Sequence, residues 1–129
     1  MVSYLKVRDL MKKDVITAGD DISVKSAIEI LHKKHSGSII IVDEERRCKG
    51  IFTERDAIRL VAGDMPLNTP IRNVMTPNPI TVHEEATFAE SMALIMNNSI
   101  RHLPVVDKEE CLTGLFSIRL FLDEILRMK

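Results

Sequence analysis

The chain has 129 residues, of which 45% are hydrophobic and 29% charged, and its formal net charge is −1. This length suits one compact domain or two small units that share a core, and the near-neutral charge argues against a general nucleic-acid binder, which would carry a strongly basic surface. Aromatic residues make up only 4% of the chain, so the stacking platforms of single-strand binding proteins are not expected.

The amino-terminal residues and the cysteines set the expected compartment. Residues 1–6 contain neither the apolar core nor the small-residue cleavage site of a secretory signal, and no apolar run approaches the roughly 18 residues of a membrane helix. The two cysteines, Cys48 and Cys111, have no second cysteine or histidine at metal-ligand spacing, which argues against a zinc site or a structural disulfide. We therefore expect a cytoplasmic protein without a metal site or a membrane segment.

The first half of the chain predicts a β-α-β-β-α unit. It opens with a short helical turn, and an amphipathic helix follows because Val24, Ala27, Ile28 and Leu31 recur at the spacing of one helical face. A near-continuous apolar run then predicts a strand that is buried on both faces. In chain order the expected elements are a turn at 7–11, an extended piece at 15–17, a helix at 23–34, strands at 38–43 and 50–53, and a helix at 54–61.

The second half repeats this plan after a linker that contains Gly63, Pro66 and Pro70. Thr87-Phe88-Ala89-Glu90 predicts a capping box at the start of its first helix. The expected elements are a turn at 71–75, an extended piece at 79–81, a helix at 87–97, strands at 102–107 and 114–117, and a helix at 118–127. The predicted boundaries are therefore 1–61 for the first unit, 62–70 for the linker and 71–129 for the second unit.

The two halves are an internal duplication. Val7-Arg8-Asp9-Leu10-Met11 recurs 64 positions later as Ile71-Arg72-Asn73-Val74-Met75. With the same offset and no gap, ten of the 52 pairs up to Ile58 and Leu122 are identical, whereas composition alone would give about three.

Several of the repeated residues resemble the cystathionine β-synthase (CBS) domain. They are Leu103-Pro104-Val105-Val106-Asp107 followed by Gly114-Leu115-Phe116-Ser117 in the second copy. In the first copy they are residues 39–43 followed by Gly50-Ile51-Phe52-Thr53-Glu54-Arg55-Asp56. The tandem resembles a Bateman module over residues 5–127. It implies an α/β (α+β) fold in which two β-α-β-β-α units, related by a pseudo-twofold axis, pack through their sheets and leave two clefts between them.

The resemblance also implies a function and a set of partners. In that family the clefts bind adenosine derivatives such as AMP, ADP, ATP and S-adenosylmethionine, and the modules regulate an enzyme, channel or transporter. The implied protein is a regulatory nucleotide-binding module that needs no cofactor. A homodimer built from the four helices is expected, with an unidentified regulated protein as a further partner.

Thr53 and Asp56 are the central residues of the first expected cleft. Thr53 begins a helix directly after a buried strand, where unpaired N–H groups and a partial charge of about +0.5 suit a phosphate. By resemblance, the Asp56 carboxylate would accept hydrogen bonds from a ribose diol. Thr-x-x-Asp is also an ordinary N-capping arrangement, worth about 1 kcal/mol without any ligand, and the two roles can coexist.

The resemblance adds further residues to this cleft. Pro79 and Ile80 would bracket the adenine, and Arg101 would reach phosphate oxygens unless it is a solvated strand-end arginine. Arg55 occupies an exposed first helical turn, where a phosphate contact and a solvated position are both open. The remaining residues implied are Gly37, Ser38, Ile100 and the segment from Thr76 to Ile80.

The second cleft departs from the family pattern. Ser117 keeps the hydroxyl, but Leu120 stands where the first copy has the diol acceptor Asp56. By resemblance, Arg101 and His102 would line its other wall, opposite Ser36, Gly37 and residues 12–16. We expect one tight site per chain and a second cleft that is empty or weaker.

An enzyme and two non-catalytic modules are the alternatives to the nucleotide-binding regulatory module. An enzyme would need a paired nucleophile and base, a metal cluster or a Gly-x-x-x-x-Gly-Lys phosphate loop, and the sequence contains none of them, so no catalytic residue is predicted. A structural interaction module without a small ligand is the main alternative. A subunit that regulates a separate enzyme or transporter through a non-adenosine ligand is the other.

Overall fold

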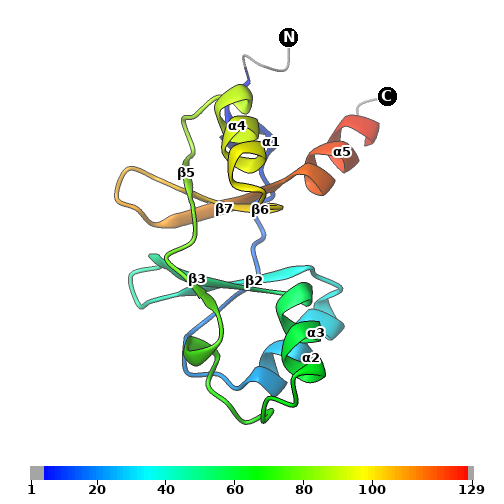
Figure 1. Ribbon diagram of the computed structural model, residues 1–129. Helices are drawn as coiled ribbons and strands as arrows, with labels where there is room; N and C mark the ends of the chain where they lie inside the picture. The colour runs from blue at the N-terminus through cyan, green and yellow to red at the C-terminus, as the bar shows by residue number, and fades with distance from the viewer. Residues whose placement is uncertain (1–4, 128–129) are drawn as a thin grey trace. The chain divides into compact units, whose positions relative to one another are not determined.

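The computed structural model describes residues 5–127, except the side chains of Leu120 and Glu124 (Figure 1). The chain divides into two compact units, with crossings between Val15 and Ile16 and between Pro79 and Ile80. Residues 16–79 form the unit that we call the continuous unit, and residues 5–15 join 80–127 in the unit that we call the composite unit.

The continuous unit is a four-stranded sheet with two helices on one face (Figure 1). The strand order is β1-β2-β3-β4, with β1 parallel to β2 and the other pairs antiparallel. Its elements are β1 (Thr17–Ala18), α2 (Val24–Lys34), β2 (Ser38–Val42), β3 (Cys48–Thr53), α3 (Glu54–Ala62), the 3₁₀ turn η2 (Ile71–Asn73) and β4 (Thr76–Pro77).

The core of the continuous unit lies between its sheet and its helices. Ile39 and Ile41 of β2 and Phe52 of β3 are fully buried and pack in one cluster with Val24 of α2 and Leu60 of α3. Ile40, on the opposite face of β2, is also fully buried. The expected burial of this strand on both faces is therefore confirmed.

The composite unit has the same plan with a three-stranded sheet in the order β5-β6-β7. Val7, Leu103 and Phe116 are fully buried in its core, and the Phe88 and Phe121 rings pack beside them with centroids 4.5 Å apart. Its elements are α1 (Val7–Leu10), β5 (Val82–His83), α4 (Phe88–Asn98), β6 (His102–Val106), β7 (Leu112–Ser117) and α5 (Ile118–Arg127). The predicted capping box of α4 is present, since Thr87 and Glu90 exchange both of its hydrogen bonds.

Backbone hydrogen bonds of the two units repeat with the 64-residue offset of the sequence. In the continuous unit, residues 69–72 bond to the stretch that enters α2, and residues 5–8 make the same bonds to the stretch that enters α4. The matched pairs are Ile71 N–H to Ile22 O and Val7 N–H to Ala86 O (both 2.7 Å), Arg72 N–H to Asp20 O and Arg8 N–H to Glu84 O (3.1 and 3.2 Å), and Val24 N–H to Thr69 O and Phe88 N–H to Leu5 O (2.9 and 2.8 Å).

The compact units differ from the sequence repeats in one segment each. Residues 71–79, which open the second repeat, complete the continuous unit, where β4 pairs with β3. Residues 5–15, which open the first repeat, complete the composite unit, where Lys12 bridges Leu115 of β7. A methionine from each segment lies against a hairpin glycine, Met75 against Gly50 and Met11 against Gly114. The strand β4 was not expected from the sequence.

The two hairpin glycines are predicted to be sites of strong steric constraint. The three atoms nearest to a Cβ at Gly50 would all belong to the Met75 side chain, whereas a Cβ at Gly114 would meet the Met11 side chain and the Lys12 carbonyl oxygen at 3.0 Å. Overpacking of this kind costs about 1–3 kcal/mol. In urea denaturation we expect Gly50→Ala to lie at the low end of this range, because a methionine can shift, and Gly114→Ala at the high end.

Gly19→Ala is the matched control for both variants. A Cβ there would have one ordinary contact, at 3.4 Å from Asp21 Oδ1, so its free energy of unfolding should stay within about 0.5 kcal/mol of wild type. Equal stabilities for all three variants would show that the methionine contacts do not constrain the hairpins.

Candidate functional site

Thr53 and Asp56 form a complete capping box at the start of α3. The Asp56 backbone N–H donates to Thr53 Oγ1 (3.2 Å). In return, Asp56 Oδ2 accepts from the Thr53 backbone N–H (2.9 Å) and from the Thr53 hydroxyl (3.1 Å). The capping interpretation of Thr-x-x-Asp is therefore confirmed, and one carboxylate oxygen of Asp56, Oδ2, serves to cap the helix.

The second oxygen of Asp56 has a partner that can be displaced. Asp56 Oδ1 lies 3.3 Å from Arg59 Nη2, and the Arg59 side chain is 63% exposed whereas that of Asp56 is 17% exposed. Ion pairs with a solvated arginine contribute about 0–1 kcal/mol. Oδ1 can consequently exchange Arg59 for a hydroxyl donor while Oδ2 keeps the helix capped.

Gly37 and Ser38 lie beside this helix start. The Gly37 carbonyl accepts from the Glu54 N–H (3.1 Å), and Ser38 stands opposite Thr53 in the β2–β3 register. The β2–β3 pairing and the start of α3 thus bring together four of the predicted residues, namely Gly37, Ser38, Thr53 and Asp56.

Three other predicted residues lie in the same unit. Thr76 pairs with Ile51 in the β3–β4 ladder and is exposed, and Arg55 is exposed on the first turn of α3. Pro79 closes the continuous unit and is half-buried.

The remaining predicted residues belong to the composite unit. His102 stands opposite Ser117 in the β6–β7 register, which is the counterpart of the Ser38–Thr53 pair. Ser117 is buried directly before α5, Arg101 is exposed, and Ile80 is 37% exposed. Ile100 is half-buried at the entry to β6. The side chain of Leu120, on which the expected asymmetry depends, lies outside the described residues. That the two groups of residues line one cleft stays a prediction.

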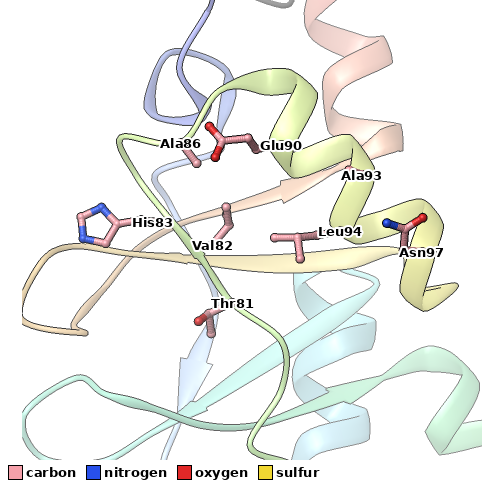
Figure 2. A pocket seen from close by; sticks show the side chains of 8 residues that line it. All are labelled: Thr81, Val82, His83, Ala86, Glu90, Ala93, Leu94 and Asn97. Carbon is pink, nitrogen blue, oxygen red and sulfur yellow. The ribbon is translucent and has the colours of Figure 1, made fainter.

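A groove in the composite unit was not anticipated from the sequence. It has a volume of about 450 Å³ and runs between β5 and α4, with Val82, Ala86 and Leu94 along it and His83 and Glu90 among its polar residues (Figure 2). Its full lining is Thr81, Val82, His83, Ala86, Glu90, Ala93, Leu94 and Asn97. The only signal in the sequence is the alanine at 86, where the first repeat has Ile22.

A second hollow of about 510 Å³ lies in the continuous unit, beside β1 and the β2–β3 hairpin. Four carboxylates line it, from Asp20, Asp21, Asp43 and Glu44, together with Lys49. Among the residues that the structure describes, no three His, Cys, Asp or Glu side chains are grouped as metal ligands. Neither hollow contains a residue predicted for the nucleotide site.

Two other chemical features bear on the site. Burial raises the pKa of the Cys48 thiol to about 11, so the reactive thiolate is scarce at neutral pH. Over the described part of the chain, no helix combines the length and apolar character needed to cross a bilayer.

Comparison with known protein families identifies the same two repeats in this chain. A family model described as the CBS domain matches residues 7–63 and again 71–127. The arabinose 5-phosphate isomerase GutQ of Salmonella typhi is 34% identical over 99 residues, which cover 77% of this chain and 31% of the isomerase. The chain therefore spans less than a third of that enzyme's length.

Solved structures of CBS pairs superpose on nearly the whole chain. The CBS domain pair of protein MJ0100, in complex with 5′-methylthioadenosine and S-adenosyl-L-methionine, has a TM-score of 0.86 and 28% identity, with 98% of this chain and 99% of that chain covered. The CBS domain protein PAE2072 from Pyrobaculum aerophilum, complexed with AMP, has a TM-score of 0.85 and 24% identity, with 95% and 99% covered, and this second likeness bears on the fold alone. The expected α/β (α+β) class is confirmed, and the chain belongs to the CBS domain family, with two CBS domains in tandem.

Proposed function

We propose that this chain is a non-catalytic regulatory module that binds an adenosine-type ligand, AMP, ADP, ATP or S-adenosylmethionine, at the start of α3. The observation that carries the proposal is the divided carboxylate of Asp56. Oδ2 caps the helix, and Oδ1 lies 3.3 Å from the Nη2 atom of Arg59, whose side chain is exposed. A ribose diol can take the place of Arg59 without uncapping the helix.

The CBS pair of protein MJ0100 supports the ligand class. Over nearly its full length it is 28% identical to this chain, and it is complexed with two compounds that contain an adenosyl group. An adenosine derivative has a ribose diol that can donate hydrogen bonds to a carboxylate. It also has a charged group, which is anionic in some adenosine derivatives and cationic in others.

The other predicted residues would hold the rest of the ligand. The start of α3 at Thr53 would face a phosphate, since the N-terminus of a helix attracts anions through its partial positive charge. Arg55 and Arg101 are exposed cations that can add to this attraction, and Pro79 and Ile80 would enclose the adenine. Thr76, Gly37, Ser38, Ile100, His102 and Ser117 complete the proposed surroundings.

One site per chain follows from the divergence of the repeats. Glu54 and Asp56 at the start of α3 are replaced by Ile118 and Leu120 at the start of α5. Ser117 is buried, and neither matching position of its helix start carries a carboxylate, so we expect the second cleft to be empty or weaker.

Exposed apolar residues on the helices support the proposed homodimer. Ile58 and Val61 of α3 are 70% and 55% exposed, and Leu122 and Leu126 of α5 are 52% and 65% exposed. These residues recur at i, i+3 or i, i+4, so each helix presents an apolar stripe, and contiguous apolar surface marks interaction sites. A reducing cytoplasmic setting agrees with Cys48 being a free thiol.

The ribose role of Asp56 predicts a preference for ribonucleotides. Loss of the 2′-hydroxyl leaves one partner of the carboxylate unsatisfied, at a cost of about 1–3 kcal/mol. Calorimetry should therefore give 2′-deoxy-AMP roughly 5- to 150-fold weaker affinity than AMP. Equal affinities would show that Asp56 does not bind the ribose diol.

If no adenine nucleotide raises the melting temperature of the protein, the alternative of an interaction module without a small ligand is favoured.

Substitutions at the helix start separate binding from capping. Asp56→Ala should weaken AMP binding at least about tenfold and lower the free energy of unfolding by about 1 kcal/mol through the lost cap. Arg59→Ala should leave binding unchanged or tighten it, because Oδ1 is then free. Thr87→Ala is the matched control, since it breaks the capping box of α4 at a similar cost in stability but should not alter affinity. Unchanged affinity in Asp56→Ala would contradict the proposed site.

The proposed homodimer predicts a particle of twice the 14.6 kDa chain mass in light scattering at micromolar concentration. Ile58→Asp places a charge in the exposed stripe of α3 and should yield the monomer. Arg46→Asp, at an exposed hairpin tip, should leave the dimer intact. A wild-type protein that scatters as a monomer would count against this assembly.

A further inference from the structure

Residues 5–12, which we call the strap, pack on the composite unit from a distant part of the chain. Val7 is fully buried, Leu10 is 7% exposed, and both belong to the core cluster of that unit. The Val7 N–H donates to the Ala86 carbonyl (2.7 Å), and Lys12 and Leu115 exchange two backbone bonds of 2.9 Å. The strap therefore supplies both core side chains and main-chain pairing to the unit.

The surface of the composite unit on which the strap packs also favours particular charges and side-chain sizes in the strap. Glu85 binds Lys6 Nζ at 2.6 Å and Arg8 Nη1 at 2.5 Å, and the Lys6 hydrogen bond is the main reason that the Glu85 pKa lies below its ordinary value. Met11 lies against Gly114, where any side chain would displace it. The surface thus fits a peptide with a buried apolar residue between two cations and a methionine four residues after it.

Connectivity distinguishes the strap from its counterpart in the continuous unit. Residues 69–76 make the matching contacts, but they follow α3 of their own unit after only the residues 63–68. The strap is separated from β5 by the whole of residues 16–79. Along the chain, the strap reaches β5 only through the folded residues 16–79, so it can leave the composite unit without moving β5, β6 or β7, whereas residues 69–76 are joined on both sides to neighbours in their own unit.

We propose that the strap is a detachable segment, which leaves the composite unit as a local opening while both sheets stay folded, and that the surface it uncovers accepts the same segment in trans. The occupant is the sequence Leu5-Lys6-Val7-Arg8-Asp9-Leu10-Met11-Lys12, from a second copy or as a free peptide. Proteins open locally as well as globally, in contiguous units smaller than the whole fold, and the exchange of one element between identical chains is a low-cost route to dimers. The inference does not depend on the proposed nucleotide site.

Native-state hydrogen exchange tests the opening in the unmodified chain. The amides of Val7, Arg8, Phe88 and Leu115 should exchange at least about tenfold faster than their counterparts Ile71, Arg72, Val24 and Ile51. The amides that join β6 to β7 should stay protected at the level of global unfolding. Strap amides that exchange only as fast as the β6–β7 amides would overturn the proposal, since the strap would then open only when the unit unfolds.

A synthetic peptide of residues 1–15 tests the receiving surface. The full chain carrying Val7→Asp, whose own strap is disabled, should bind this labelled peptide one to one in fluorescence anisotropy. Wild type should bind it at least about tenfold more weakly, because its own strap competes at the high effective concentration of a tethered segment. Ile71→Asp, the matched change in the continuous unit, should bind no more tightly than wild type, and a peptide carrying Val7→Asp should not bind.

Failure of the folded Val7→Asp chain to bind the peptide would overturn exchange in trans. So would equal binding by the Val7→Asp and Ile71→Asp chains, since a surface specific to the composite unit predicts a difference. If Val7→Asp does not fold, the strap is inseparable from its unit, and the exchange rates of wild type must then agree with global unfolding.

Discussion

Each unit depends on a methionine that rests on a hairpin glycine, Met75 on Gly50 and Met11 on Gly114. The missing Cβ lets a neighbouring segment lie directly on the hairpin, so that Thr76 can pair with Ile51 and Lys12 with Leu115. This close packing attaches the opening segment of each repeat to its unit. The β2–β3 hairpin ends in Thr53, so the packing of Met75 on this hairpin also supports the strand that leads into α3, where the candidate site lies.

The candidate site and the fold share one side chain. Asp56 satisfies two donors of Thr53 through Oδ2 and faces an exposed arginine through Oδ1. A carboxylate that is anchored on one side costs little entropy when it binds, because its rotamer is already fixed. The capping box thus positions the proposed acceptor before any ligand arrives, and the same geometry explains why the sequence alone could not separate a cap from a binding residue.

Local patterns in the sequence were sufficient for the helices, the central strands and the Thr87–Glu90 cap, because spacing and capping residues act over a few positions. They were insufficient for β4, which is only Thr76–Pro77 and finds its partner in Gly50 and Ile51, 25 or more residues earlier. The groove beside α4 also escaped prediction, since it depends on the size of Ala86 in three dimensions. Of the site, the Ser38–Thr53 pairing follows from register, whereas a cleft formed by both repeats stays a prediction.

Duplication has given this chain two units with matching contacts and different connectivity. The continuous unit contains its 69–76 segment close in sequence to α3 and carries Asp56 at the start of the helix that follows its β2–β3 hairpin. The composite unit receives its equivalent segment across residues 16–79 and has Ile118 and Leu120 at the matching helix start. A binding carboxylate must be held in place, which favours the unit whose packed segments are close together in the sequence. A segment that is to be released gains from distant connectivity, because it can leave without moving the strands on which it packs. The order of elements along the chain, and not the contacts themselves, therefore separates the roles proposed for the two copies.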